Sequence, residues 1–171
     1  MLIRPATEAD WPAIWPFYRR IAEAGETYSL PTGQSEAEAV SEWFVPGHAV
    51  VVAVGDDGAI LGSAHYGPNR PARGSHVATA SFMVAPEAAG QGVGRALGEH
   101  VVAAAAEAGF RSIQFNAVVE TNAAAVRLWT SLGFDIVGTV PEAFDHPTLG
   151  LVGLHVMYRR LGHSRRLGRT D

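Results

Sequence analysis

The sequence predicts a single-domain α/β protein of the α+β type, in which a mixed, mostly antiparallel central sheet is flanked by helices. Its 171 residues are the length of one ordinary domain. Hydrophobic residues make up 47% and charged residues 18% of the chain, which is a globular composition. Short β-branched runs alternate with amphipathic segments, and glycine and proline fall between them. This alternation predicts the element order β-α-α-β-β-β-α-β-α-β-β.

Each element follows from local periodicity and from its end signals. Residues 2–4 can form a first strand, and Thr7 as N-cap starts a helix with apolar residues at helical spacing that ends at Gly25. Ser35 and Glu38 form a capping-box pattern for a short second helix that reaches residue 44. The remaining elements are strands over 48–54, 59–66 and 75–84, a helix over 91–108, a strand over 112–118, a helix over 122–132, and strands over 134–140 and 151–158.

The composition excludes several classes of site. The chain contains no cysteine, which excludes disulfides, thiolate metal sites and a cysteine nucleophile. Its 13 basic residues are all arginine, so a Schiff-base lysine and a lysine-containing phosphate loop are excluded as well. The seven histidines show no close ligand spacing, and we therefore expect no metal site.

The charge is unevenly distributed along the chain. The formal net charge is −4, but residues 159–171 carry five arginines against one aspartate, so the rest of the chain is acidic. We expect residues 1–160 to form one domain and residues 161–171 to be a flexible basic tail, with a phosphate-binding or oligomer-forming arm as the alternative. An acidic body disfavours nucleic acid, and no apolar run is long enough to cross a membrane. No secretory signal is visible, which predicts a cytoplasmic protein, and a homodimer is compatible with the sequence.

The most informative segment is residues 82–97, where a strand stops at Pro86 and a glycine-spaced turn opens a helix. Gly90, Gly92 and Gly94 permit close approach of the backbone, so successive N–H groups can converge on a phosphate. The helix start adds unpaired donors and the positive end of its dipole. The dinucleotide fingerprint GxGxxG fails here, because its last glycine is absent in either register. The alternative is a turn that only packs a helix tightly on a strand.

Two motifs of this chain resemble those of the GCN5-related N-acetyltransferase (GNAT) superfamily. The first is an apolar-x-Val-x-Pro strand end followed by [Arg/Gln]-x-x-Gly-x-[Gly/Ala], matched by Phe82, Val84, Pro86, Gly92, Gly94 and Leu97. The second is Asn-x-x-Ala-x-x-Leu-Tyr-x-x-x-Gly-Phe, matched by Asn122, Ala125, Leu128, Gly133 and Phe134. Ala89 replaces the Arg or Gln of the first motif, and Trp129 replaces the Tyr of the second. The resemblance implies the GNAT-like acyl-CoA N-acyltransferase fold over residues 1–160.

The resemblance also implies acetyl-CoA as co-substrate. The cofactor-binding residues would be Phe82, Met83, Val84, Ala89, Gly90, Gln91, Gly92, Val93, Gly94, Arg95, Asn122 and Trp129. Pantetheine would pair with the backbone of residues 82–84 like an added strand, and the diphosphate would meet residues 90–95. Asn122 and Trp129, seven residues apart on one helix, would line the pantetheine and thiol end.

The acceptor site in this family is built from the segment between the first two helices and from the C-terminal hairpin, here residues 26–30 and 141–150. Glu26 and Tyr28 would give an anionic group and an aromatic wall, and both also fit a surface loop. Asn116 is either a satisfied buried amide or a hydrogen-bonding partner of the substrate.

Candidate proton-transfer groups are few. Two histidines are candidate bases that act through water: His76, which we also expect in the substrate site, and His155. For each of them the alternative is a structural or surface role. Tyr158 or His155 could protonate the leaving thiolate if either points inward, since the indole of Trp129 does not give up its proton near neutral pH.

The function that this resemblance implies is transfer of an acetyl group from acetyl-CoA to a primary or secondary amine of a small molecule by direct attack. Three alternatives remain open: a non-catalytic acyl-CoA-binding or sensing module, an acetyltransferase of protein N-termini, and a purely structural partner-binding protein with no affinity for coenzyme A.

Overall fold

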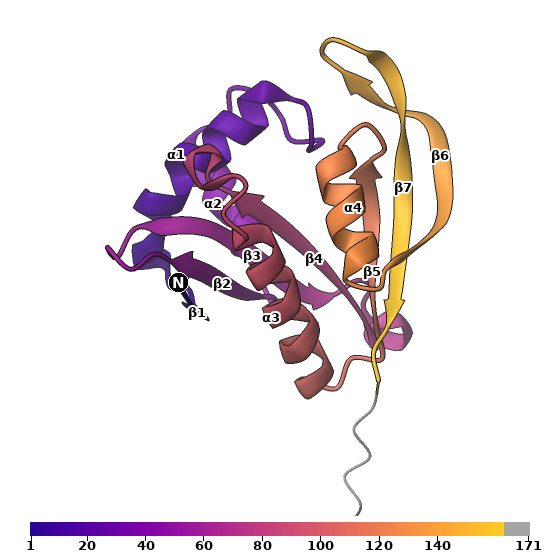
Figure 1. The fold of residues 1–171 in the computed structure, drawn as a ribbon, viewed down its shortest axis with the longest axis horizontal. Coiled ribbons are helices and arrows are strands. Elements are labelled where there is room, and N and C mark those ends of the chain that lie inside the picture. The colour runs from indigo at the N-terminus through magenta and orange to yellow at the C-terminus, as the bar shows by residue number, and fades with distance from the viewer. Residues whose placement is uncertain (163–171) are drawn as a thin grey trace, which may run out of the picture.

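The computed structural model describes residues 1–162, which form one sheet between two layers of helices (Figure 1). Its strands are β1 (Leu2–Pro5), β2 (Ala49–Val54), β3 (Ile60–Pro68), β4 (Val77–Val84), β5 (Ser112–Val119), β6 (Asp135–His146) and β7 (Gly150–Arg160). Its α-helices are α1 (Trp11–Ala24), α2 (Glu36–Trp43), α3 (Val93–Glu107) and α4 (Ala123–Ser131). Short 3-10 turns occupy Glu8–Asp10, Ala72–Gly74 and Pro86–Ala88.

The sheet has the strand order β1-β2-β3-β4-β5-β7-β6. Its central neighbours β4 and β5 run parallel, whereas the other neighbouring pairs are antiparallel. The parallel pair is joined only at Val77 with Ser112 and at Ala78 with Ile113. Beyond these residues the two strands diverge, although each keeps its antiparallel partner on the other side. The sheet is therefore split along its middle, and the split opens toward the end of β4.

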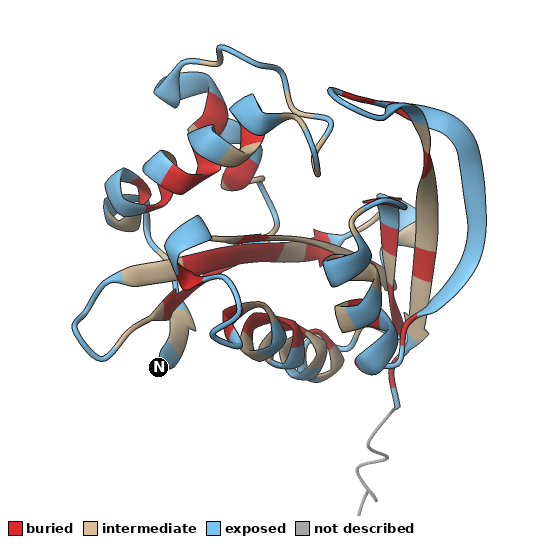
Figure 2. Cartoon of the chain, turned by 45° about the horizontal axis from the view of Figure 1, so that its top comes forward, coloured by how far each residue is buried: buried red, intermediate tan, exposed pale blue. Residues whose placement is uncertain are grey.

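The core lies on both faces of the sheet, with α1 and α2 on one face and α3 and α4 on the other (Figure 2). The buried hydrophobic residues of the helices face the strands, while the outer surface of β6 is exposed. A polar link crosses the core on the α2 side: Trp43 Nε1 donates to Ser63 Oγ at 2.9 Å, and Ser63 Oγ donates to the Val51 carbonyl at 2.9 Å. This link fixes α2 on β2 and β3, because an unpaired buried hydroxyl or indole N–H would cost free energy.

The sequence-based fold class and element order are confirmed, with three local differences. Thr7 opens a 3-10 turn, its N–H donating to Asp10, and α1 begins only at Trp11. The strand expected to stop at residue 140 continues to His146, because an irregularity with Glu142 at a φ of 53° lets pairing with β7 resume. Leu161, assigned to the tail, is 4% exposed and bonds to Arg111 through its N–H. Of the expected tail, residues 163–171 lie outside the described residues. Within residues 1–162, no helix is both long and apolar enough to span a bilayer.

Packing between α3 and α4 depends on Gly98. A Cβ at this position would lie 2.6 Å from Leu132 Cδ1 and 3.0 Å from Trp129 Cζ3. We expect Gly98→Ala to lower the free energy of unfolding by about 1 kcal/mol, because overpacking costs more than the helix propensity of alanine returns. Urea denaturation measures this, with Gly138→Ala as control, since nothing lies within 4 Å of a Cβ there. An increase in the free energy of unfolding of Gly98→Ala would contradict the tight contact of Gly98 with Leu132 and Trp129.

Candidate active site

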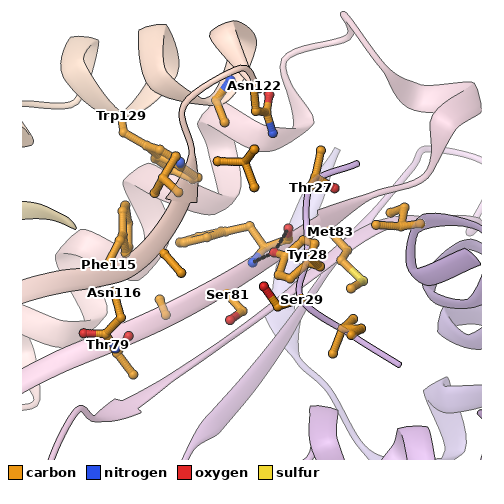
Figure 3. A pocket seen from close by; sticks show the side chains of 18 of the residues that line it. Thr27, Tyr28, Ser29, Thr79, Ser81, Met83, Phe115, Asn116, Asn122 and Trp129 are labelled. Carbon is orange, nitrogen blue, oxygen red and sulfur yellow. Dashed lines mark hydrogen bonds between the residues drawn. The ribbon is translucent and has the colours of Figure 1, made fainter. Parts of the chain in front are cut away.

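A cavity of about 480 Å³ lies where β4 and β5 diverge (Figure 3). Its walls come from β4, β5, the start of α4, and the irregular segment between α1 and α2. The lining residues are Ile21, Thr27, Tyr28, Ser29, Leu30, Thr79, Ala80, Ser81, Phe82, Met83, Val84, Phe115, Asn116, Ala117, Val118, Val119, Asn122, Ala125 and Trp129. The split in the sheet is therefore also the site of this cavity.

The backbone of β4 presents an open edge to this cavity. Ala85 N–H donates to the Leu61 carbonyl of β3, and in an antiparallel pair alternate residues bond to the partner strand. Phe82 and Val84 therefore direct their N–H and C=O groups away from β3, toward the split. This is the edge along which the family resemblance predicts that pantetheine pairs like an added strand.

Tyr28 occupies part of that edge. Its hydroxyl accepts from Phe82 N–H at 2.9 Å and donates to the Phe82 carbonyl at 2.5 Å (Figure 3). Burial raises the pKa of Tyr28 to about 12, opposed in part by the backbone donor of Phe82. The hydroxyl is therefore protonated at neutral pH and holds the segment between α1 and α2 against β4.

Aromatic rings form the wall on the α4 side. The Trp129 ring lies 4.6 Å from Phe82 and 4.9 Å from Phe115 between centroids, and Phe115 stacks on Phe134 at 4.3 Å. Trp129 is 7% exposed, and its remaining surface faces the cavity. Such contacts add to burial and hold the rings in fixed orientations. The wall suits a thin apolar chain rather than a charged group.

Asn122 both caps helix α4 and lines the cavity. Its Oδ1 accepts from Ala125 N–H at 3.1 Å, so the residue is the N-cap of α4. This bond uses the carbonyl end of the side chain, and the residue as a whole lines the cavity rim (Figure 3). The amide nitrogen remains available for a ligand.

The glycine turn adopts the geometry that its sequence predicts. Gly90 and Gly92 have φ of 78° and 81°, in the left-handed region, and Gly92 is the N-cap of α3. A Cβ at either position would have nothing within 4 Å, so both glycines face open space. The first-turn N–H groups of α3 have no acceptors within the helix. The turn can therefore hold an anion through backbone donors, which is the fit that a diphosphate requires.

The other predicted residues of this turn have mixed environments. Gln91 Nε2 donates to the Glu87 carbonyl at 3.0 Å, and Arg95 reaches Ser131 Oγ at 2.8 Å, so both side chains make contacts within the protein. Val93 is buried in the core, and Ala89 offers only its backbone. The turn lies beyond the lining of the cavity itself.

Asn116 lies at the opposite wall, in a network of amides. Its Nδ2 donates to Asn69 Oδ1 at 2.7 Å, and its Oδ1 accepts from Gln114 Nε2 at 2.8 Å. Asn116 is exposed rather than buried and lines the cavity. Of the two interpretations of Asn116, the structure therefore excludes the buried amide.

Four of the predicted catalytic and substrate residues lie outside the cavity. Glu26 is exposed and is absent from the lining, although its neighbours 27–30 form a wall. His76 is exposed at the closed end of the split, where its carbonyl accepts from Arg111 N–H. His155 Nδ1 lies 2.8 Å from Thr139 Oγ1, and Tyr158 pairs with Gln114 of β5 and Asp135 of β6; neither residue lines the cavity. The hairpin segment 141–150 also does not line it.

Sequence reasoning missed part of the polar wall. Thr27, Ser29, Thr79 and Ser81 bring hydroxyl groups to the cavity (Figure 3). The two β4 residues alternate with Ala80 and Phe82, so their side chains lie on the opposite face of the sheet from the Phe82 ring. This polar alternation in an otherwise apolar strand was the signal that could have identified them.

The comparisons with known proteins agree with this geometry. Residues 11–134 match the model of the Acetyltransferase (GNAT) family, so the chain belongs to this family. An N-acetyltransferase of Schizosaccharomyces pombe, aca1, is 37% identical over 84 residues, a match that covers 49% of this chain and 40% of that protein. The chain thus spans less than half the length of this curated relative.

Solved structures give the fold over nearly the whole chain. A GCN5-related N-acetyltransferase from Kribbella flavida is 57% identical, with a TM-score of 0.91, and the match covers 94% of this chain and 97% of that one. A phosphinothricin acetyltransferase from Sinorhizobium meliloti, in complex with acetyl-CoA, is 27% identical with a TM-score of 0.84, covering 99% and 93%.

The N-cap of α4 is open to a direct test. We expect Asn122→Ala to lower the free energy of unfolding by about 1 kcal/mol, because the Ala125 N–H loses its acceptor. Asn122→Asp keeps an acceptor oxygen and should retain most of the stability. Urea denaturation of the two variants checks this, and equal losses in both would contradict the capping role.

Proposed function

We propose that the protein is an acetyl-CoA-dependent N-acetyltransferase that acts on an amine of a small molecule by direct attack. The observation that carries this proposal is the adjacency of the cavity, the open edge of β4 and the glycine turn: Val84 lines the cavity, and a Cβ at Gly94 of the turn would lie 3.7 Å from Val84 Cγ2. A backbone anion site at one end and a strand edge beyond it suit an elongated ligand with a diphosphate and two amide groups. The acetyl-CoA complex of the phosphinothricin acetyltransferase relative supports this assignment.

The residues fit acetyl-CoA in three places. Backbone N–H groups between Gly90 and Arg95 would hold the diphosphate, apart from that of Gln91, which donates to the Ala88 carbonyl; the positive φ of Gly92 exposes the backbone there. Val84 would pair with pantetheine through the groups it directs into the split. Trp129 and Asn122 would line the thiol end. Acetyl-CoA would supply an activated acyl group to the acceptor.

The chain's own contribution to the chemistry would be positioning and charge stabilisation. Phe82 N–H already has the Tyr28 hydroxyl as acceptor, which leaves Val84 as the nearest β4 donor toward the turn. A fixed backbone donor of this kind, aimed at the developing oxyanion, is worth about 3 kcal/mol. The aromatic wall would exclude water from the thioester.

An assay of thiol release tests the proposal. Acetyl-CoA is supplied with a panel of amino acids, aryl amines, polyamines and peptide N-termini, and coenzyme A binding is measured separately by calorimetry. Release that requires an amine supports the proposal. Binding without turnover on any amine would favour a non-catalytic acyl-CoA-binding module, the second candidate, which the replacements at Ala89 and Trp129 favour. Turnover on peptide N-termini alone would shift the acceptor to proteins.

Gly92 should be essential for coenzyme A binding. A side chain at this left-handed position would project into the open space at the turn, so we expect Gly92→Ala to weaken coenzyme A binding by more than about tenfold, or 1.4 kcal/mol. Gly109→Ala is the matched control: Gly109 has a φ of 89° with nothing within 4 Å, and it lies just beyond the other end of α3. Both variants should lose similar stability, but only the first should lose affinity. Equal affinities would contradict the assignment of the turn.

Trp129 should act by packing rather than by proton transfer. An indole N–H donates a hydrogen bond but does not ionise near neutral pH, and the ring is held between Phe82 and Phe115. We expect Trp129→Phe to retain single-turnover acetyl transfer within about tenfold at saturating acetyl-CoA, under 1.4 kcal/mol of barrier. A thousandfold loss with binding intact would show that the indole takes part in the chemical step.

A further inference from the structure

The walls of the cavity carry no charged side chain. Among the described residues that line it, none is Asp, Glu, His, Lys or Arg. Its polar groups are the hydroxyls of Thr27, Ser29, Thr79 and Ser81, the Tyr28 phenol, and the amides of Asn116 and Asn122. These groups donate and accept hydrogen bonds but cannot compensate a full charge. A cation that enters such a cavity loses water without gaining a counter-ion.

Titratable groups on the surrounding elements lie outside this wall. Glu26 in the segment before Tyr28 and Arg127 on α4 are exposed and do not line the cavity. Tyr18 on α1 donates to Glu42 at 3.2 Å, on the side of the helix that faces α2. Glu120 at the end of β5 is bound by the Gly153 N–H of β7.

One histidine lies on the strand next to β4. His65 pairs across from Ser81 in the β3–β4 register, and its Nδ1 lies 3.1 Å from His48 Nδ1. Burial, together with the neighbouring His48, lowers the pKa of His65 to about 4. His65 is therefore neutral at physiological pH, and it does not line the cavity.

Tyr28 is the one ionisable group among the lining residues of the described chain, and its hydroxyl is already used. The oxygen accepts from Phe82 N–H, and the proton is donated to the Phe82 carbonyl. Removing that proton would leave a phenolate facing a carbonyl oxygen in a buried position, which is unfavourable. Tyr28 is therefore a fixed wall of the cavity and not a base.

We infer that the acceptor is a weakly basic amine, such as an aryl amine, which enters the cavity uncharged without an enzymic base to deprotonate it. This inference rests on the proposed function and narrows its substrate class. It excludes polyamines and aminoglycosides, whose several positive charges would have no counter-ion here.

The reaction balances without an enzymic base. The lone pair of the neutral amine nitrogen forms a bond to the thioester carbonyl carbon, and the C–S bond breaks with its electron pair going to sulfur. The nitrogen then loses the proton that it carried as an N–H, and the departing thiolate gains it, directly or through water. The products are the amide and coenzyme A thiol, with no net proton released.

Two isomeric amines provide a matched kinetic test: 4-methylaniline is neutral near pH 7, whereas benzylamine is protonated. With acetyl-CoA saturating, we expect kcat/KM for 4-methylaniline to be independent of pH between about 6 and about 9. With benzylamine it should rise about tenfold per pH unit, following the neutral fraction of the amine. An ascending limb for 4-methylaniline, or a plateau for benzylamine well below its own pKa, would reveal an enzymic base and overturn the inference.

Binding gives a readout that does not need turnover. Calorimetry of each amine with the coenzyme A complex, in buffers of different ionisation enthalpy, counts the protons released. We expect about one proton released per benzylamine bound near pH 7, or no benzylamine binding, and none released with 4-methylaniline. Benzylamine bound without proton release, or a cavity that binds neither amine, would overturn the inference. If 4-methylaniline binds without proton release but no amine of the panel is acetylated, the proposed function fails, and what remains is a cavity that binds neutral amines without transferring an acetyl group to them.

A charge introduced into the wall should reverse the preference. In Ser81→Asp a carboxylate would pair with the ammonium form, so benzylamine should bind without releasing a proton. Ser81→Asn is the matched control and should behave as the wild type. If Ser81→Asp fails to fold, Thr79→Asp and Thr79→Asn test the same wall. If a folded Asp variant still releases a proton when it binds benzylamine, the uncharged wall is not what makes the cavity select the neutral amine.

Discussion

The early end of pairing between β4 and β5 is the constraint on which the rest of this structure depends. Two parallel strands in the middle of a sheet are usually covered and fully paired, because unpaired buried backbone groups cost free energy. Here pairing stops after Ala78 and Ile113, so the β4 edge beyond needs other partners. Tyr28 provides one by bonding both groups of Phe82. A ligand with amide groups can provide the others.

The split is held open by side chains. Phe115 on β5, Phe82 on β4 and Trp129 on α4 meet in one aromatic cluster, with Phe134 stacked behind. Rings of this size cannot approach more closely, and their contacts resist closure of the strands. Gly98 lets α3 pack closely against Trp129 of the same cluster. The hydrophobic core and the cavity wall are therefore built from the same residues, so changes at Trp129 affect packing as well as the site.

The sequence predicted those features that are encoded locally. Element order, the capping box at Ser35, and the left-handed glycines at 90 and 92 follow from periodicity and from backbone preferences, and the structure has all of them. Features that depend on contacts through space were missed. The bond from Tyr28 to β4 spans 54 residues of sequence, and nothing local distinguishes Tyr28 from Glu26, which points to solvent. The extended β6 was missed because its pairing resumes after an irregularity at Glu142 that no local pattern signals.

In terms of hydrogen bonding, the single sheet consists of two leaves, one ending at β4 and the other beginning at β5, joined by two residue pairs. The aromatic cluster keeps the seam between them open, while the antiparallel ladders on either side stay intact. A strand-like ligand laid along the seam would pair with the free backbone groups of β4 and extend the ladder across it. Ligand binding would then add backbone pairs between the two leaves, so that their association becomes part of the binding free energy.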